Sequence, residues 1–158
     1  MEEDKTKVQA PLQPLIPDPA LRRLDILVGK WDLRGRTLDT AEDNITGWVI
    51  FEWLPGGFFL QARGEIDFMG TKIQSLEILG YDPQTHIFPA SVYSNMDGNM
   101  MQYYWDIQGD TVTHWTEGST YTGTMSDDGN TLAGGWRPQE GSEGGPESTY
   151  DAVMTRVK

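Results

Sequence analysis

Two side chains in the sequence, Glu77 and His114, have the chemistry to orient a ligand or to exchange protons with it. Each belongs to a stretch in which apolar and polar residues alternate, the pattern of a β-strand with one buried face. A Met-Gly turn pairs Glu77 with Ala62, and a Gly-Asp turn pairs His114 with Trp105. Both pairings place the polar side chain among apolar neighbours, so the acid and the imidazole are expected to face one interior.

The residues that share this inward face have the composition of a ligand pocket, because most are aromatic or aliphatic and only a few are polar. The ligand-binding set predicted from the alternation is Phe51, Trp53, Ser75, Glu77, Tyr103, Trp105, His114, Tyr121 and Trp136. Thr116 and Tyr150 are further polar members of this face, and glycines at positions 64, 123 and 134 remove volume from it. Small barrels are commonly filled by their inward side chains, so a filled interior is the alternative.

The elements that must hold these side chains are short strands joined by tight turns. Turn signals such as Pro-Gly-Gly and Asp-Gly recur along the chain and separate the alternating stretches. They predict successive antiparallel hairpins whose registers are set by the turns. The predicted pairs nearest the turns are Trp53–Phe58, Asp67–Lys72, Asn95–Met100, Ile107–Val112, Thr116–Tyr121 and Met125–Leu132.

About ten such strands in hairpin order predict an all-β fold, an up-and-down antiparallel β-barrel. Closing the sheet removes two long exposed edges, and the alternative is a sandwich of two sheets. Residues 18–29 predict a short helix that closes one end, with Asp18 as its N-cap, Pro19 in its first turn and Gly29 at its end. Residues 1–17 carry three prolines and predict a flexible arm, whereas residues 18–158 predict a single barrel domain.

The composition disfavours several classes of partner and site. The chain has 158 residues, a formal net charge of −12 and no cysteine. Nucleic acid and anionic membranes require a basic patch, so neither is expected as a partner. Without cysteine there is no disulfide, thiolate or zinc–cysteine site, and no metal site is predicted. The first residues, MEEDKTKVQAP, lack the apolar segment of a secretory signal, so the expected location is cytoplasmic.

The stretch Gly29-Lys30-Trp31 follows the predicted helix and begins the first strand, and it resembles the start of the calycin barrels. These are the lipocalins, fatty-acid-binding proteins and nitrobindins. The resemblance implies that Trp31 plugs the closed end of the barrel and stacks on Arg156 of the last strand. Residues 24–137 are also similar to a bacterial family of lipocalin-like domains of unknown function. The stretches that carry this likeness are LDILVGKW, FEWLPGGFFL, SLEILGYD and DGNTLAGGW.

The chain departs from these families in ways that bear on the ligand. The loop after the first strand is too short for the helical lid of fatty-acid-binding proteins, and the interior charge is the acid Glu77 rather than an arginine. A fatty-acid anion is therefore a poor candidate. Nitrobindins have a glycine two residues after the tryptophan, where this chain has Leu33.

Three functions are compatible with this interior. The first is binding of a small, neutral, hydrophobic or aromatic molecule, oriented by Glu77, His114 and a tyrosine hydroxyl. The second is a cofactor-independent enzyme of the isomerase, cyclase or hydratase type, with Glu77 and His114 as its acid–base groups. The third, by analogy with nitrobindin, is a haem-binding barrel with His114 as axial ligand. The first is preferred, because no nucleophile motif, phosphate loop or dinucleotide fingerprint is present.

Three aromatic residues, Trp48, Tyr104 and Trp115, fall on the outward face of the same strands. They are surplus apolar surface for a protein that is otherwise polar outside. Such a patch suits a contact between two copies of the chain, so a homodimer through these residues is the predicted protein partner.

Overall fold

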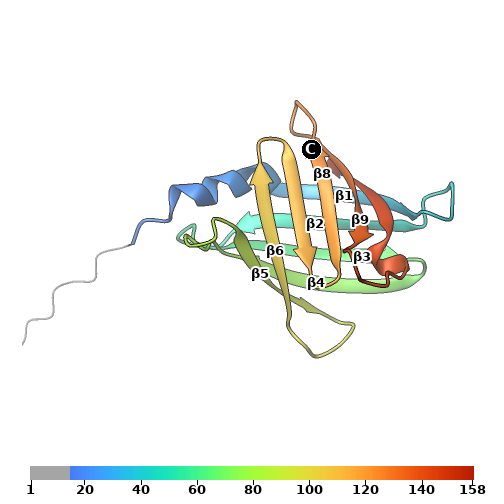
Figure 1. The fold of residues 1–158 in the computed structure, drawn as a ribbon. Helices are drawn as coiled ribbons and strands as arrows, with labels where there is room; N and C mark the ends of the chain where they lie inside the picture. The colour runs from blue at the N-terminus through green and yellow to red at the C-terminus, as the bar shows by residue number, and fades with distance from the viewer. Residues whose placement is uncertain (1–14) are drawn as a thin grey trace, which may run out of the picture.

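The computed structural model describes residues 15–158, which form ten antiparallel strands and two short 3₁₀ helices (Figure 1). The strands are β1 (Gly29–Thr37), β2 (Ile45–Trp53), β3 (Leu60–Phe68), β4 (Thr71–Leu79), β5 (Phe88–Ser94), β6 (Met101–Gln108), β7 (Thr111–Thr116), β8 (Ser119–Met125), β9 (Thr131–Pro138) and β10 (Tyr150–Arg156). The helices are η1 (Pro19–Leu27) and η2 (Pro146–Ser148). Most of the predicted arm, residues 1–14, lies outside the described residues.

The sheet closes into a barrel. Each strand pairs with the next one along the chain, and β1 pairs with β10. At this seam Trp31 lies opposite Arg156 and Leu33 lies opposite Met154, so the inward face of β1 continues into that of β10. The predicted up-and-down barrel is thus confirmed, and the two-sheet sandwich is not formed.

The pairings that place the two candidate site residues agree with the sequence. Ala62 lies opposite Glu77, and Trp105 lies opposite His114. The turns that fix these pairings are tight, and Gly70 and Gly109 in them have positive φ angles of 95° and 61°. Local turn chemistry therefore determines the register in this part of the sheet.

Three predicted registers are wrong by two residues. Trp53 pairs with Leu60 instead of Phe58, and the hairpins around residues 95–100 and 117–120 shift in the same way. In the second case Asn95 is held by β4, because its backbone N–H donates to the carbonyl of Gln74 at 3.1 Å. Side chains alternate with a period of two, so a shift of two residues leaves every side chain on its predicted face.

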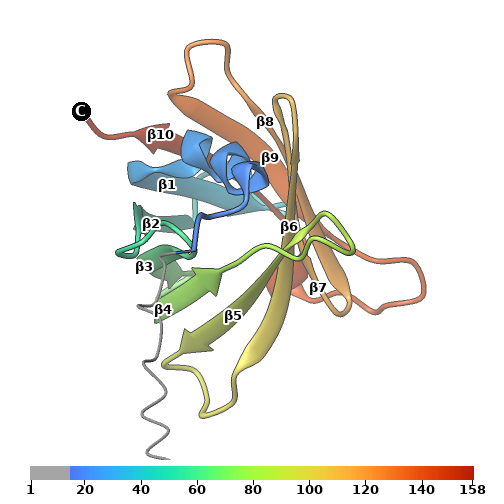
Figure 2. The ribbon, with the colours of Figure 1, turned by 90° about the vertical axis from the view of Figure 1, so that its left-hand side faces the viewer.

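Helix η1 lies across one end of the barrel, as Figure 2 shows when it looks onto that end. Its N-terminus is capped as predicted, because the Asp18 carboxylate accepts from the N–H of Ala20 at 2.9 Å. The apolar face of the helix, Leu21, Leu24 and Leu27, is buried in the core. The helix ends at Leu27, two residues before the predicted Gly29, which instead begins β1.

Trp31 fills the end of the barrel under this helix and is fully buried. Its Nε1 donates to the carbonyl of Leu27 at 2.8 Å, and the guanidinium of Arg156 lies over its ring at 4.2 Å. Arg156 also donates to the carbonyls of Ile26 at 2.9 Å and of Val28. The Trp–Arg stack that the resemblance implied is therefore present, and it fastens β10 to the helix.

Candidate functional site

Two adjoining cavities occupy the lumen of the barrel. The inner cavity has a volume of about 190 Å³ and is lined mostly by apolar and aromatic residues. The outer cavity has a volume of about 780 Å³ and lies among the loops at the end opposite η1. The residues that line both cavities, which we call the neck, are Ile66, Ser75, Glu77, His114 and Trp136. An apolar cavity of about 150 Å³ suffices for a benzene ring, so the inner cavity can hold one aromatic group.

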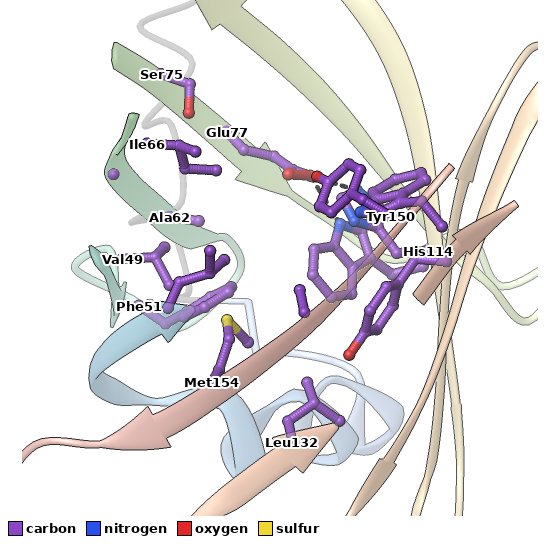
Figure 3. A pocket seen from close by; sticks show the side chains of 16 residues that line it. Val49, Phe51, Ala62, Ile66, Ser75, Glu77, His114, Leu132, Tyr150 and Met154 are labelled. Carbon is purple, nitrogen blue, oxygen red and sulfur yellow. Dashed lines mark hydrogen bonds and ion pairs between the residues drawn. The ribbon is translucent and has the colours of Figure 1, made fainter. Parts of the chain in front are cut away.

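Glu77 projects from β4 into the lumen and is only 8% exposed (Figure 3). Its Oε2 accepts a hydrogen bond from Nε1 of Trp105 at 2.7 Å. Its Oε1 makes no hydrogen bond with any described residue. The small cross-strand neighbour Ala62 leaves room beside the carboxylate. One oxygen is therefore fixed by the protein, and the other is available within the cavity.

His114 is held by stacking rather than by hydrogen bonds. Its ring lies on Trp105 with centroids 3.7 Å apart and an interplanar angle of 17°. Tyr103 and Trp136 lie on other sides of the ring, with centroid distances of 5.0 Å and 5.2 Å. Its Nε2 is 3.3 Å from Oε2 of Glu77, yet it is buried without a hydrogen-bond partner among the described residues. The acid and the imidazole thus meet in one cavity.

Three tyrosines, Tyr103, Tyr121 and Tyr150, line the same two cavities. Burial raises the pKa of Tyr121 and of Tyr150. Burial, followed by the negative charge of Glu77, raises the pKa of Tyr103. All three are therefore neutral at physiological pH, and each hydroxyl can donate or accept a hydrogen bond.

Most of the predicted ligand-binding set is brought together by the fold. Phe51, Trp105 and Tyr121 line the inner cavity, Tyr103 lines the outer one, and the neck contains the rest of the set except Trp53. Trp53 faces η1 instead. Its Nε1 donates to Asp25 at 2.8 Å, and the guanidinium of Arg22 lies over its ring at 4.3 Å. The helix, whose docking position the sequence did not specify, covers this side chain.

Two parts of the site are missing from the predicted set. The first is the apolar wall that closes the inner cavity, which includes Leu33, Val49, Leu132, Ala152 and Met154. Strand alternation was enough to find it, because these residues share a face with Trp31, Phe51 and Arg156. The second is a group of acidic residues in the loops of the outer cavity, Asp97, Glu117, Glu143 and Glu147. No periodic signal marks such loops, so only the structure reveals that they meet.

The outward aromatic residues have partners within the chain. Tyr104 and Trp115 stack on one another with centroids 5.6 Å apart. Trp48 lies under the cations of Arg63 at 5.5 Å and Lys30 at 6.0 Å. All three aromatic side chains are half-buried. The homodimer expected from them stays a prediction.

The described residues do not favour a haem or a metal site. Among residues 15–158 there is no group of three or more His, Asp or Glu side chains placed to hold a metal ion. The Nε2 of His114 lies 3.3 Å from Oε2 of Glu77 and the ring is stacked on Trp105, so this nitrogen is not free to serve as an axial ligand. Haem carboxylates would also meet the acidic loops of the outer cavity. We therefore derive no chemistry through either group.

Comparison with known proteins gives a family and no activity. A family model described as "Protein of unknown function (DUF1579)" matches residues 17–137, which include η1 and most of the barrel. No curated protein matches the chain. Within the described part of the chain, neither helix has the length and apolar character needed to cross a membrane.

Proposed function

The chain belongs to the DUF1579 family, and we propose that its barrel binds a small, largely apolar or aromatic molecule in the lumen. The observation that carries this proposal is the pair of cavities joined at a polar neck. The inner cavity offers an apolar wall of one-ring size, and Glu77 and His114 stand at its entrance. A concave apolar site with a few polar groups that fix orientation is the usual form of a small-molecule site.

The calycin likeness belongs to the same proposal. The closed up-and-down barrel, the helix across one end and the contact of Trp31 with Arg156 all support a lipocalin-like domain over residues 18–158. In such a barrel the ligand enters through the end opposite the plug. This agrees with the position of the outer cavity among the loops opposite η1.

A filled-cavity variant tests the proposal directly. Ala152 lines the inner cavity, and its neighbour Val153 is 41% exposed on the outer face of the same strand. We expect wild-type protein and Val153→Phe to bind the neutral dye Nile red, which is longer than the inner cavity and must extend from it through the neck into the outer cavity. Ala152→Phe should weaken that binding, because its phenyl ring fills the inner cavity. Circular dichroism and thermal unfolding establish that each variant is folded, with Ala152→Met as the milder filler. Unchanged dye binding in both folded fillers would contradict the proposal.

The contact between Glu77 and His114 supports a second candidate, an acid–base enzyme of the isomerase, cyclase or hydratase type. Proton transfer requires two titratable groups within reach of one bound molecule, and Nε2 lies 3.3 Å from Oε2 inside the shared neck. Identification of the co-purified molecule by native mass spectrometry, followed by incubation in deuterated water, tests it. Deuterium incorporation that is lost in Glu77→Gln and in His114→Gln supports catalysis, and no incorporation leaves binding alone.

A further inference from the structure

The geometry points to the class of molecule that this lumen accepts, a small aromatic or apolar ligand that carries a cationic nitrogen. This inference rests on the proposed binding function and adds the group that Glu77 would hold. The sequence alone predicts a neutral ligand. Three features of the structure favour a positive charge instead: a buried carboxylate with no lysine or arginine beside it, aromatic faces without a cation, and an acidic entrance.

The first feature is the electrostatic state of Glu77. Removing a carboxylate from water is costly unless a donor or a cation replaces the lost hydration. Trp105 supplies one N–H to Oε2, whereas the buried Nε2 of His114 forms no hydrogen bond with the same oxygen. No lysine or arginine lines either cavity in the described chain. The free Oε1 is therefore suited to a donor that arrives with the ligand, and an ammonium group is the strongest such donor.

The second feature is the distribution of cations over aromatic rings. A cation is attracted to the face of tryptophan, tyrosine or phenylalanine. The protein's own cations cover rings at the closed end and on the outer wall: Arg156 over Trp31, Arg22 over Trp53, Arg23 over Phe88, and Lys30 and Arg63 over Trp48. Tyr103 of the outer cavity meets Trp136 of the neck edge to face, with ring centroids 6.4 Å apart, and neither has such a cation among the described residues. Their position beside Glu77 and His114 gives a ligand cation an aromatic wall as well as a carboxylate.

The third feature is the charge at the entrance. The loops of the outer cavity contribute Asp97, Glu117, Glu143 and Glu147, and no lysine or arginine of the described chain lines this cavity. Carboxylates gathered around a cavity with low-dielectric walls attract cations and repel anions. These acids lie in the β5–β6, β7–β8 and β9–β10 connections, which an up-and-down barrel places at the same end, so their position around one opening is a property of the fold. The entrance and the neck therefore select for the same sign of charge.

A matched set of probes tests this inference. Tryptamine, tryptophol and indoleacetate share the indole ring and a two-carbon side chain, but at neutral pH they end in an ammonium, a hydroxyl and a carboxylate. We expect calorimetric titration to give affinities in the order tryptamine, tryptophol, indoleacetate. The affinity for tryptamine should exceed the affinity for tryptophol about tenfold, the effect of one charge-assisted hydrogen bond relative to a neutral one.

The decisive variant is Glu77→Gln, which keeps an oxygen for the Trp105 indole and removes the charge. It should abolish the preference for tryptamine over tryptophol and leave the affinity for tryptophol within about threefold of the wild-type value. The control, Glu52→Gln, changes an outer-face carboxylate that accepts from Gln61 at 3.2 Å, and it should keep the preference. Thermal unfolding of each variant shows that it is folded.

The outcomes separate this inference from the function on which it rests. If tryptophol or indoleacetate binds wild-type protein as tightly as tryptamine, or if Glu77→Gln keeps the preference, charge selection by Glu77 is overturned while ligand binding stands. If no indole probe binds and Nile red is also excluded, the binding function and the inference fail together. If the probes bind in the expected order and the order is lost only in Glu77→Gln, both are supported.

Discussion

At the closed end of the barrel, arginine side chains cover aromatic rings and donate to backbone carbonyls, whereas at the open end the acidic groups that line the cavity have no lysine or arginine beside them in its wall. Arg156 at the closed end lies over Trp31 and has three carbonyl partners, Ile26, Val28 and Gly129. At the open end the carboxylate of Glu77 has one described donor, the indole of Trp105. Both ends combine aromatic rings with charged groups, but among the described residues only the closed end gives its charged group a full set of hydrogen-bond partners.

The different hydrogen bonding of the charged groups at the two ends suggests that one end serves stability and the other serves binding. Polar groups that find all their partners inside the protein contribute to a unique, rigid structure. Polar groups that are buried without partners are a cost to folding, and their retention is explained when a ligand supplies the missing partner. Residues at the closed end are therefore expected to contribute most to the stability of the barrel, and residues at the open end to ligand affinity.

The largest expected effect compares two tryptophans. Trp31→Ala removes a fully buried ring from the closed end and should lower the free energy of unfolding by about 3–5 kcal/mol. Trp136→Ala removes a half-buried ring that already borders the cavities, so its cost should be about 1–2 kcal/mol. Urea unfolding followed by circular dichroism measures both. Equal costs would show that the open end is as tightly packed as the closed end.

The next effect compares the charged side chains of Arg156 at the closed end and Glu77 at the neck. Arg156→Gln leaves several carbonyls at the closed end without their donor, and it should destabilise the protein by about 2–3 kcal/mol. Glu77→Gln keeps an acceptor for Trp105 and removes the desolvation cost of a charge, so stability should change by less than about 1 kcal/mol in either direction. Thermal and urea unfolding of the two variants give the comparison. A loss of several kcal/mol for Glu77→Gln would make that carboxylate structural.

Much of the fold and of the inner site follows from strand alternation in the sequence. The inward placement of Glu77 and His114 depends only on parity, which survives the two-residue errors in three hairpins. The capped helix and the alternating strands carry local signals that do not depend on distant contacts. Closure of the sheet into a barrel could also be predicted from the number of strands, because an open sheet of this size would leave two unpaired edges.

Apart from the apolar wall of the inner cavity, which strand alternation was enough to find, the parts that sequence reasoning missed are decided by contacts between distant segments. Trp53 has the correct parity for the lumen, yet Arg22 and Asp25 of the docked helix cover its ring. The register at Asn95 is decided by hydrogen bonds to β4 rather than by its own turn. Glu117 and Glu143 meet at the entrance because loops far apart in the chain are brought to the same end of the barrel.

A third comparison concerns the tyrosines on the lumen side of the barrel, whose titration at alkaline pH differs between the folded and the unfolded protein. Burial raises the pKa of Tyr121 and Tyr150 in the folded protein, whereas unfolded tyrosine titrates near pH 10. Above that pH the unfolded chain loses protons that the folded protein keeps, so stability is complete below about pH 10 and falls as the pH rises. The slope should approach about 1.4 kcal/mol per pH unit for each such tyrosine. Urea unfolding between about pH 8 and pH 11 measures this slope. Tyr150→Phe should reduce it by the contribution of one tyrosine.

The smallest expected effect concerns the side wall, where Tyr104 stacks on Trp115. If the aromatic residues of this wall have all their partners within one chain, as those of the closed end do, Trp115→Ala should lower the free energy of unfolding by no more than about 1 kcal/mol. This is the value of a cross-strand aromatic pair. The molecular mass in solution should then be the same for wild type and variant, because an intrachain contact does not hold two copies together. Sedimentation velocity measures this mass. A wild-type mass of two chains that falls to one in Trp115→Ala would show instead that the wall is the subunit contact predicted from the sequence, and that the side wall, like the open end, is completed by another molecule.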